Sequence, residues 1–568
     1  MIDRRGFVQA AAAAAVLTGG APLGRLAAQQ ALTQRDLLAF EPLGQVTLLH
    51  FTDIHAQLTP VHFREPSMNV GVGAAAGLPP HLTGRHLLAH YGLSPGSAAA
   101  HAFTSEDFVA LARGYGRMGG LDRMATLVKA IRAERPGRVL LLDGGDTWQG
   151  SHVSTVTRGA DMVEAMHALG VEAMTAHWEF TYGAERVREL KDALRFPFLC
   201  GNVKEEPFGD AVFDAAAAFE RGGVRIAVIG QAFPYTPIAN PRWMIPDWSF
   251  GIEEDRLRER VAAARADGAD LVVLLSHNGF DVDRKLAGRV AGIDVILTGH
   301  THDALPAPEI VGGTLLIASG SHGKFLSRLD LEVKDRRVAA WRYRLIPIFA
   351  DAIAPDPEMA ALIARLRAPY RGELDRVLGR TEELLYRRGN LSGTFDDLIC
   401  AALTSERDAE IALSPGFRWG TTLLPGETIR AEDVHAQTAI TYPQVYRSAM
   451  TGRMLKDILE DVADNLFNPD PYLQQGGDMV RVGGMSYALD VGQPIGRRIS
   501  DMRRTRDDSP IEADRSYVVA GWASVNEGTE GPPVFDLVAR HIERQGVVRL
   551  PPAPRVRIAG ADPRGMAP

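Results

Sequence analysis

A chain of 568 residues is longer than one hydrophobic core usually organises, so we expect two domains. Charged residues make up 23% of the chain and the formal net charge is -8. No basic excess is available to displace counterions, which argues against general binding to nucleic acid or to an anionic membrane surface. The two cysteines, Cys200 and Cys400, exclude a disulfide framework and a cysteine-based zinc site.

Residues 1–30 have the features of an export signal. Arg4 and Arg5 precede a short apolar stretch over residues 10–17, and small residues follow up to residue 28. The paired arginines resemble the twin-arginine class, whose substrates leave the cytoplasm folded. A membrane anchor is the alternative interpretation. We expect the segment to be cleaved and the mature protein to be periplasmic, with no membrane attachment.

Residues 31–350 are predicted to form an α/β domain. Six apolar runs of strand length end in polar residues and glycine: QVTLLHFTD, RVLLLDGGD, VRIAVIGQ, DLVVLLSHN, DVILTGHTH and TLLIASGSHG. Between them, residues 119–136 and 254–270 carry apolar residues three and four positions apart, as surface helices do. Repeated strand and helix segments predict layered sheets with covering helices.

One insertion, residues 60–116, interrupts this pattern. It is rich in Gly, Ala, Pro and Ser and contains five histidines: His62, His81, His86, His90 and His101. A loop of this length is usually functional or mobile. Two interpretations stay open, a lid or partner-binding segment over the end of the first strand, and a solvated excursion with incidental histidines.

The pattern changes near residue 350. Residues 351–380 look like one long linker helix that begins near Pro355 and Pro357. Residues 381–562 then mix a helix at TFDDLICAAL, strands at AEIALSPG and SYVVAGW, and a strand-to-helix pair at YRSAMTGRMLKDILEDVADNL. We therefore expect a second domain of the α+β class.

Residue types that bind metal ions recur where the predicted strands of the first domain end. They are Asp53, His55, Asp146, His177, His277, His300 and His302. Sites in open α/β sheets form at the carboxyl ends of strands. Side chains two apart on an extended segment point the same way, so Asp53 pairs with His55, and His300 with His302. Five imidazoles and two carboxylates suffice for two ions that share one carboxylate.

Each motif alone has an ordinary explanation. A D-x-H pair is usually a surface contact, a G-D pair after a strand is usually a turn, and an H-x-H pair is ambiguous. Their joint occurrence, in this order and each at a strand end, favours a dinuclear metal site.

In this order, FTDIHAQL, LLDGGDTWQGS, AHWEFTYG, LLSHNG and LTGHTHD resemble the calcineurin-type metallophosphoesterase domain, and specifically its 5′-nucleotidase branch. GGLDRMATLV and residues 381–562 resemble the neighbouring segment and the C-terminal substrate domain of that branch. The resemblance implies a four-layer αββα catalytic domain. It also implies one ion on Asp53, His55, Asp146 and His302, and a second ion on Asp146, His177, His277 and His300.

The chain departs from the nucleotidase pattern at informative positions. The pattern G-N-H-E-F-D-Y-G reads AHWEFTYG here, so His177 takes the place of a ligand asparagine. Trp178 takes the place of the histidine that assists the leaving group. In the second domain SPGFRWG replaces N-G-G-G-I-R, and NEGTEGPP stands near the usual G-G-D-G-Y. The nucleotide-binding motifs are thus only partly retained, while Arg418 remains a candidate for binding an anion.

Together, HWEFTYG, DGGDTWQGS and the export signal resemble the SoxB family of thiosulfohydrolases. The resemblance implies a dimanganese enzyme that releases sulfate from a cysteine S-thiosulfonate on a sulfur-carrier protein of the SoxYZ type. The leaving persulfide is far less basic than an alkoxide, so it needs no general acid and an indole at Trp178 is tolerated. Core packing is the alternative role of Trp178. We expect Glu179 to orient a ligand histidine.

Several points stay open in the sequence. Imidazole and carboxylate ligands also suit zinc or iron, and manganese follows from the resemblance alone. A monomer is expected. The alternative functions are a periplasmic 5′-nucleotidase or cyclic-nucleotide phosphodiesterase, and a non-catalytic carrier-binding scaffold that keeps metals for stability.

Overall fold

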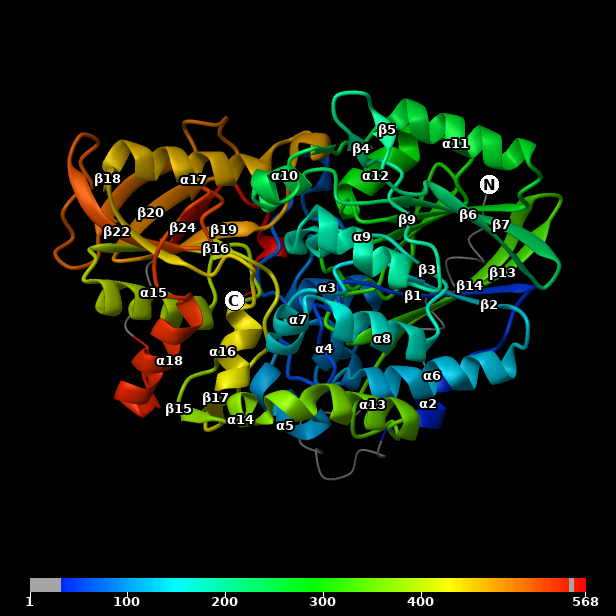
Figure 1. Cartoon of the computed structure of the whole chain (residues 1–568), viewed down its shortest axis with the longest axis horizontal. Coiled ribbons are helices and arrows are strands. Elements are labelled where there is room, and N and C mark those ends of the chain that lie inside the picture. Colours follow the sequence, from blue (N-terminus) through cyan, green and yellow to red (C-terminus); the bar gives the residue numbers. More distant parts are fainter. Residues whose placement is uncertain (1–31, 551–555, 568) are drawn as a thin grey trace.

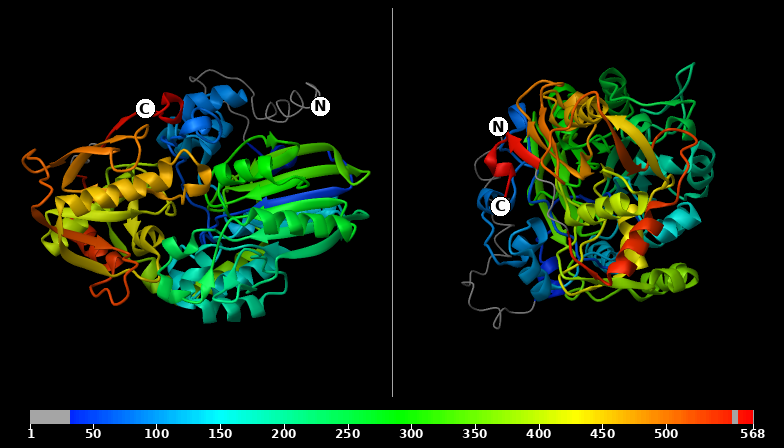
Figure 2. Two further views of the ribbon diagram at one scale, coloured as in Figure 1. Left: turned by 90° about the horizontal axis from the view of Figure 1, so that it is seen from above. Right: turned by 90° about the vertical axis from the view of Figure 1, so that its left-hand side faces the viewer.

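The computed structural model describes residues 32–550 and 556–567, so the predicted export signal lies outside the described residues. Two domains lie side by side (Figure 1). In the first domain two sheets face each other, and in the second, helices pack around smaller sheets (Figure 2). Among the described residues, no helix has the length and apolar character needed to cross a membrane.

The first sheet of the first domain has five strands. In spatial order they are β14 (Arg337–Pro347), β13 (Phe325–Lys334), β1 (Val46–Phe51), β2 (Val139–Asp143) and β3 (Ala173–Met174). Strands β1, β2 and β3 run parallel, whereas β13 pairs antiparallel with β1. The parallel strands therefore end at one edge, where their following loops meet.

The second sheet has six strands. In spatial order they are β11 (Glu309–Val311), β12 (Thr314–Ala318), β10 (Val295–Thr298), β9 (Leu271–Ser276), β7 (Val224–Gln231) and β6 (Ala216–Arg221). Strands β7, β9, β10 and β12 are parallel, and their apolar sequences are buried on both faces. Along β9, Leu271 and Val273 join the core between the sheets, and Val272 and Leu274 face the outer helices.

Helices cover the outer faces of the two sheets. On the side of β1 and β2 lie α6 (Leu121–Glu134), α8 (Ala160–Leu169) and α13 (Pro357–Arg367). On the side of β9 lie α11 (Glu254–Ala266) and α12 (Phe280–Arg289). The domain is thus the expected four-layer αββα fold. Shorter elements complete it: α2 (Gln34–Leu38), α7 (His152–Thr157), α9 (Ala184–Ala193), α10 (Thr236–Ala239), β4 (Lys204–Glu205), β5 (Asp210–Ala211) and β8 (Trp248–Ser249).

The insertion, residues 60–116, folds into three short helices: α3 (Gly84–Tyr91), α4 (Ala98–Phe103) and α5 (Phe108–Tyr115). All of α4 is buried, including His101. Lys324 is fully buried and donates to the Glu65 carboxylate at 2.5 Å, which fixes the insertion to the rest of the first domain. The insertion is therefore a packed element and not a solvated excursion.

The linker differs from the single long helix expected from the sequence. Helix α13 ends at Arg367, a 3-10 turn covers Ala368–Tyr370, α14 spans Arg371–Leu374, and residue 377 already begins a strand. Pro369 explains the break, because proline lacks a backbone N–H and disfavours helical geometry in the residue before it.

The described part of the second domain contains three small sheets and four main helices. Its strands are β15 (Val377–Thr381), β16 (Ile411–Gly416), β17 (Thr428–Arg430), β18 (Val445–Thr451), β19 (Asp478–Gly483), β20 (Met485–Asp490), β21 (Ile499–Arg504), β22 (Ser516–Trp522), β23 (Val547–Val548) and β24 (Val556–Ala559). Its helices are α15 (Thr394–Arg407), α16 (Ala431–Thr438), α17 (Gly452–Phe467) and α18 (Val534–Gln545). The domain is of the α+β class, as expected.

Candidate metal centre

The seven predicted ligands come together at the edge where the parallel strands of both sheets end. Each lies a few residues beyond a strand: β1, β2, β3, β9 or β10. Five of the seven have a left-handed backbone, with φ between 50° and 75°: Asp53, His55, Asp146, His300 and His302. The expectation that an extended segment brings Asp53 next to His55, and His300 next to His302, is therefore wrong, although Asp53 and His55 do fall in one ligand group. Tight left-handed loops aim them instead, and such strained backbone is common at functional sites.

The ligand atoms form two groups that share Asp146, as the resemblance implied. One group contains Asp53, His55, Asp146 and His302; the other contains Asp146, His177, His277 and His300. Within each group the ligand atoms lie within 4.8 Å of one another, and all seven residues are buried. The structure therefore brings all seven together, and cation binding by them stays a prediction.

Second contacts fix the orientation of two ligand rings. His277 Nδ1 lies 2.6 Å from the carbonyl oxygen of Gly144, and His55 Nδ1 lies 3.2 Å from that of Gln149. An Nδ1–H that donates to a carbonyl leaves Nε2 with a free lone pair, which is the arrangement of a metal-binding histidine. Gly299 allows this close packing, because a Cβ there would lie 2.9 Å from the His277 ring.

The donor atoms fit divalent cations. His55 Nε2 and His302 Nε2 face each other at 3.0 Å, the distance of an N–H···N hydrogen bond and close enough for both nitrogens to coordinate one cation. Burial holds the pKa of His300 and of His302 well below the ordinary value, so both rings stay neutral and able to coordinate. Burial lowers the pKa of His277, but Asp146 and Asp53 outweigh burial and raise it to about 10. With this raised pKa, His277 carries a proton that compensates the negative charges of Asp146 and Asp53. A bound cation would compensate these charges in its place.

Backbone hydrogen bonds support the shared carboxylate. Trp178 donates its backbone N–H to Asp146 Oδ1 at 2.7 Å. Glu179 is fully buried and accepts from four backbone N–H groups, including those of His177 at 2.7 Å and Thr147 at 2.6 Å. Glu179 therefore orients the ligand loops through their backbone, and the expected contact with a ligand histidine is its bond to the backbone N–H of His177.

A cavity of about 770 Å³ opens beside the ligands, between the two domains; we call it the aromatic cavity. Its wall includes Trp178, Phe233, Tyr235, Phe417, Trp419, Tyr442, Tyr446 and Trp522. Trp178 packs edge-on against Trp419, with ring centroids 5.0 Å apart, and Phe417 stacks on Trp419 at 4.1 Å. Trp178 thus belongs both to the packed wall and to the cavity next to His177. The insertion, all of which the structure describes, contributes no residue to the wall of this cavity.

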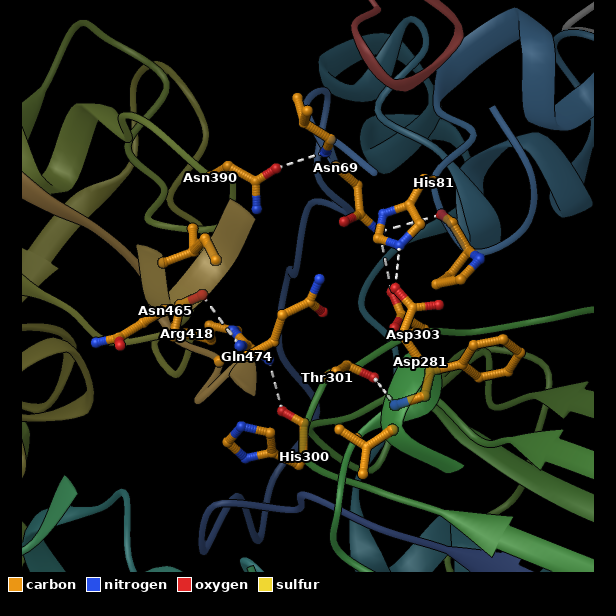
Figure 3. Close-up of a pocket in the computed structure, with 18 of the residues that line it drawn as sticks. Asn69, His81, Asp281, His300, Thr301, Asp303, Asn390, Arg418, Asn465 and Gln474 are labelled. Carbon is orange, nitrogen blue, oxygen red and sulfur yellow. Dashed lines mark hydrogen bonds and ion pairs between the residues drawn. The ribbon is translucent and has the colours of Figure 1, made fainter. Parts of the chain in front are cut away.

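Arg418 also lines the aromatic cavity, but its contacts differ from the expected anion site. It donates to the carbonyl oxygen of His300 at 2.7 Å and to that of Gly477 at 3.0 Å. Figure 3 shows the bond to His300 at the edge of a second, smaller cavity of about 70 Å³. We call it the polar chamber; its lining includes Asn69, His81, Asp281, Asp303 and Asn390. Binding of an anion by Arg418 stays a prediction.

Two further residues at this centre were not selected from the sequence. His322 is fully buried, stacks on Phe63 at 4.1 Å, and lies 5.6 Å and 5.8 Å from the rings of His55 and His302. Its signal was present, because SGSHG follows a strand as the ligand motifs do. Arg388, which donates to the carbonyl oxygen of Thr301 at 2.9 Å, carries no sequence signal for this contact.

The chain is similar to known proteins along most of its length. Residues 377–537 match the family model described as 5'-nucleotidase, C-terminal domain. The solved structure of a sulfate thiohydrolase SoxB from Thermus thermophilus, in complex with glycerol, is 37% identical. That likeness covers 92% of this chain and 98% of the other, with a TM-score of 0.88.

More distant similarities are to nucleotidases. The 5'-nucleotidase of Rattus norvegicus is 25% identical over 478 residues, which is 75% of this chain and 80% of the relative. A 5'-nucleotidase precursor, also from Thermus thermophilus, shares the fold at 20% identity, with a TM-score of 0.71 over 91% of this chain and 99% of the other.

Proposed function

The chain belongs to the SoxB family within the 5′-nucleotidase superfamily of metal-dependent hydrolases, and from that premise we propose that it releases sulfate from a cysteine S-thiosulfonate on a sulfur-carrier protein. Water supplies the oxygen that converts the terminal sulfonate to sulfate. The sulfur–sulfur bond breaks, and its electron pair leaves on the carrier's persulfide. We further propose two manganese ions as the native metals and the periplasm as the place of action.

The observation that carries the proposal is Trp178 in the wall of the aromatic cavity. Four histidines line this cavity, and all four belong to the ligand groups. The position that assists an alkoxide leaving group in nucleotidases thus holds an indole, which does not titrate. A persulfide leaves without proton transfer, so this cavity suits sulfur–sulfur cleavage better than phosphomonoester cleavage.

The roles of the chain's own residues follow from the geometry. The seven ligands would hold two cations, which supply Lewis-acid chemistry to the anionic group and to water. Glu179 and the Trp178 N–H keep Asp146 in place between the two groups. The aromatic wall offers polarisable contacts to sulfur atoms of the substrate.

The alternative is 5′-nucleotide hydrolysis, which the sequence relatives favour. The stacked pair of Phe417 and Trp419 restricts it, because one face of each ring is covered by the other ring and is closed to a nucleobase. A cavity of about 770 Å³ does not discriminate by size alone.

The test is sulfate release from a carrier-bound thiosulfonate by manganese-loaded enzyme, with AMP as the competing substrate. We expect sulfate release and little AMP turnover, and loss of both metal and activity in Asp146→Asn. Trp178→Phe keeps an aromatic wall and serves as the matched control for Trp178→His, which we expect to be less active on the thiosulfonate. AMP turnover without sulfate release would refute the proposal, and metal analysis of protein isolated from the periplasm tests manganese.

A further inference from the structure

We propose that Arg388 and Arg418 of the second domain are positioning residues, which clamp the loop carrying His300 and His302 in its metal-binding geometry. The inference rests on the proposed function only in that the seven ligands bind cations. It assigns to the second domain, which contributes no predicted ligand, control over the metal centre.

The clamp consists of direct contacts across the domain boundary. Arg418 donates to the carbonyl oxygen of His300 at 2.7 Å, and Arg388 donates to that of Thr301 at 2.9 Å. The arginines are 8% and 3% exposed, so these bonds are not exchanged freely with water. Figure 3 shows the first of them, with Arg418 reaching His300 from the opposite side of the polar chamber to Asp281 and Asp303.

The clamped loop is one that needs support. Strand β10 ends at Thr298, so residues 299–302 have no ladder partners. His300 and His302 both have left-handed backbone, with φ of 75° and 60°, which is strained for a residue with a side chain. The loop gives one ligand to each group, so a shift of its carbonyls displaces a donor atom of both ions.

The guanidinium of Arg418 bridges the two domains. One terminal nitrogen donates to His300 and the other donates to Gly477 of its own domain. The planar guanidinium therefore links the two carbonyls in a fixed geometry. The neighbouring Gly476 packs so closely on the edge of the His300 ring that a Cβ would overlap with Nε2. Backbone and side chains of the second domain thus touch both ends of this ligand.

The experiment measures metal affinity directly, in the full chain. Metal-stripped wild type, Arg388→Met, Arg418→Met and the double variant are titrated with Mn²⁺, and melting is followed with and without Mn²⁺. We expect two ions on the wild type and about 10- to 100-fold weaker binding in the variants, the effect typical of residues that orient ligands. We expect saturating Mn²⁺ to restore turnover in the variants. Arg418→Lys keeps the positive charge but not the planar pair of donating nitrogens, so we expect its Mn²⁺ affinity to lie between those of the wild type and Arg418→Met.

Two controls separate this role from general effects. Arg132→Met removes an arginine that donates to the backbone carbonyls of Leu169 and Gly170, far from the loop. Lys285→Met removes an ion pair between the domains, to Asp470 at 2.5 Å, without touching residues 299–302. Both should bind Mn²⁺ as the wild type does.

Each other outcome has a distinct meaning. A wild type that binds no Mn²⁺ contradicts the metal centre and the proposed function together. Variants that bind Mn²⁺ normally but have a raised KM overturn the clamp in favour of an anion contact. Variants with a lower melting temperature but normal affinity overturn it in favour of a purely structural role. If Arg418→Met does not fold, Arg418→Lys and Arg388→Met provide the same comparison.

Discussion

Backbone groups, more than side chains, build the surroundings of the ligands. Glu179 illustrates this, because both of its carboxylate oxygens accept backbone N–H groups of loops that carry ligands. Burial raises the pKa of Glu179, while the N–H groups of His177 and Thr147 act in the opposite direction. The residue therefore acts as an acceptor that ties the Asp146 loop to the His177 loop.

Glu179→Gln tests this role by replacing one acceptor oxygen with an NH₂ group. A glutamine offers one oxygen and turns its NH₂ group toward two N–H donors, so two buried donors lose their acceptor. We expect the variant to lose about 2–4 kcal/mol of stability and to bind Mn²⁺ more weakly. The measurement is the melting midpoint of metal-free protein together with a Mn²⁺ titration.

Glu185→Gln is the matched control, because Glu185 is exposed nearby on α9 and the same charge is removed. We expect it to stay within about 0.5 kcal/mol of the wild type. Equal midpoints and affinities for the two variants would show that Glu179 has no special role.

At the scale of elements, the sequence predicted the strands better than their arrangement. All six apolar runs became strands, because buried parallel strands need continuous apolar sequence. The pairing of β1 with β13 was not predictable, since β13 and β14 follow the last run as a long antiparallel pair and complete the first sheet. Two facing sheets came from the family resemblance and not from the pattern.

The candidate metal centre was likewise predictable only in part. Strand-end histidines and aspartates were visible in the sequence, because the carboxyl ends of parallel strands meet. The left-handed loops that aim Asp53 and His300 were not visible, since they depend on tertiary contacts such as the bond from the His300 N–H to Asp53. Arg388 was missed because its partner lies 87 residues away in the sequence.

The insertion is held to the catalytic domain by an ion pair whose strength depends on pH. His81 Nε2 lies 2.7 Å from the Asp281 carboxylate at the start of α12. Burial lowers the pKa of His81, but attraction to Asp281 and Asp303 outweighs burial and Arg284, so the net shift is upward. Burial raises the pKa of Asp281, but His81 and Arg284 outweigh burial and lower it.

The sign of the pH dependence follows from these shifts. The stability from His81 is full below its unfolded pKa, about 6.5, and is lost as pH rises through the raised folded value. The stability from Asp281 is present above about pH 4 and is lost as pH falls through its lowered folded value. His81→Gln should therefore lower the melting midpoint most near pH 6 and least at pH 9. His86→Gln, at an exposed position, is the control, and a difference that does not change with pH would contradict the pair.

At the scale of the whole molecule, contacts other than the arginine clamp also tie the two domains together. Gln149 donates to the carbonyl oxygen of Ala439, Tyr235 donates to that of Tyr472, and Lys285 pairs with Asp470. The aromatic cavity lies between the domains, so these contacts also set its width. A domain that moved as a free body would break them together with the arginine clamp.

The C-terminal segment is one of these ties, and its removal tests how far they act locally. After β24 the chain crosses to the insertion, where Ala567 donates to Ser67, Thr83 donates to Arg564 and Asn69 donates to Gly565, all through backbone groups at 2.7–3.0 Å. Deleting residues 556–568 leaves these donors and acceptors of the insertion without partners. We therefore expect amide exchange of residues 67–83 to become at least about 10-fold faster. This factor is equivalent to about 1.4 kcal/mol of local stability. Exchange in α11, on the far side of the catalytic domain, should not change, and Mn²⁺ affinity should stay within a few-fold because the clamp is intact. Unchanged protection of residues 67–83 would mean that contacts other than the C-terminal segment, such as those of Lys324 and Asp281, are enough to hold the insertion. A fall in Mn²⁺ affinity would mean that the segment positions the second domain, and so the clamp, from a distance.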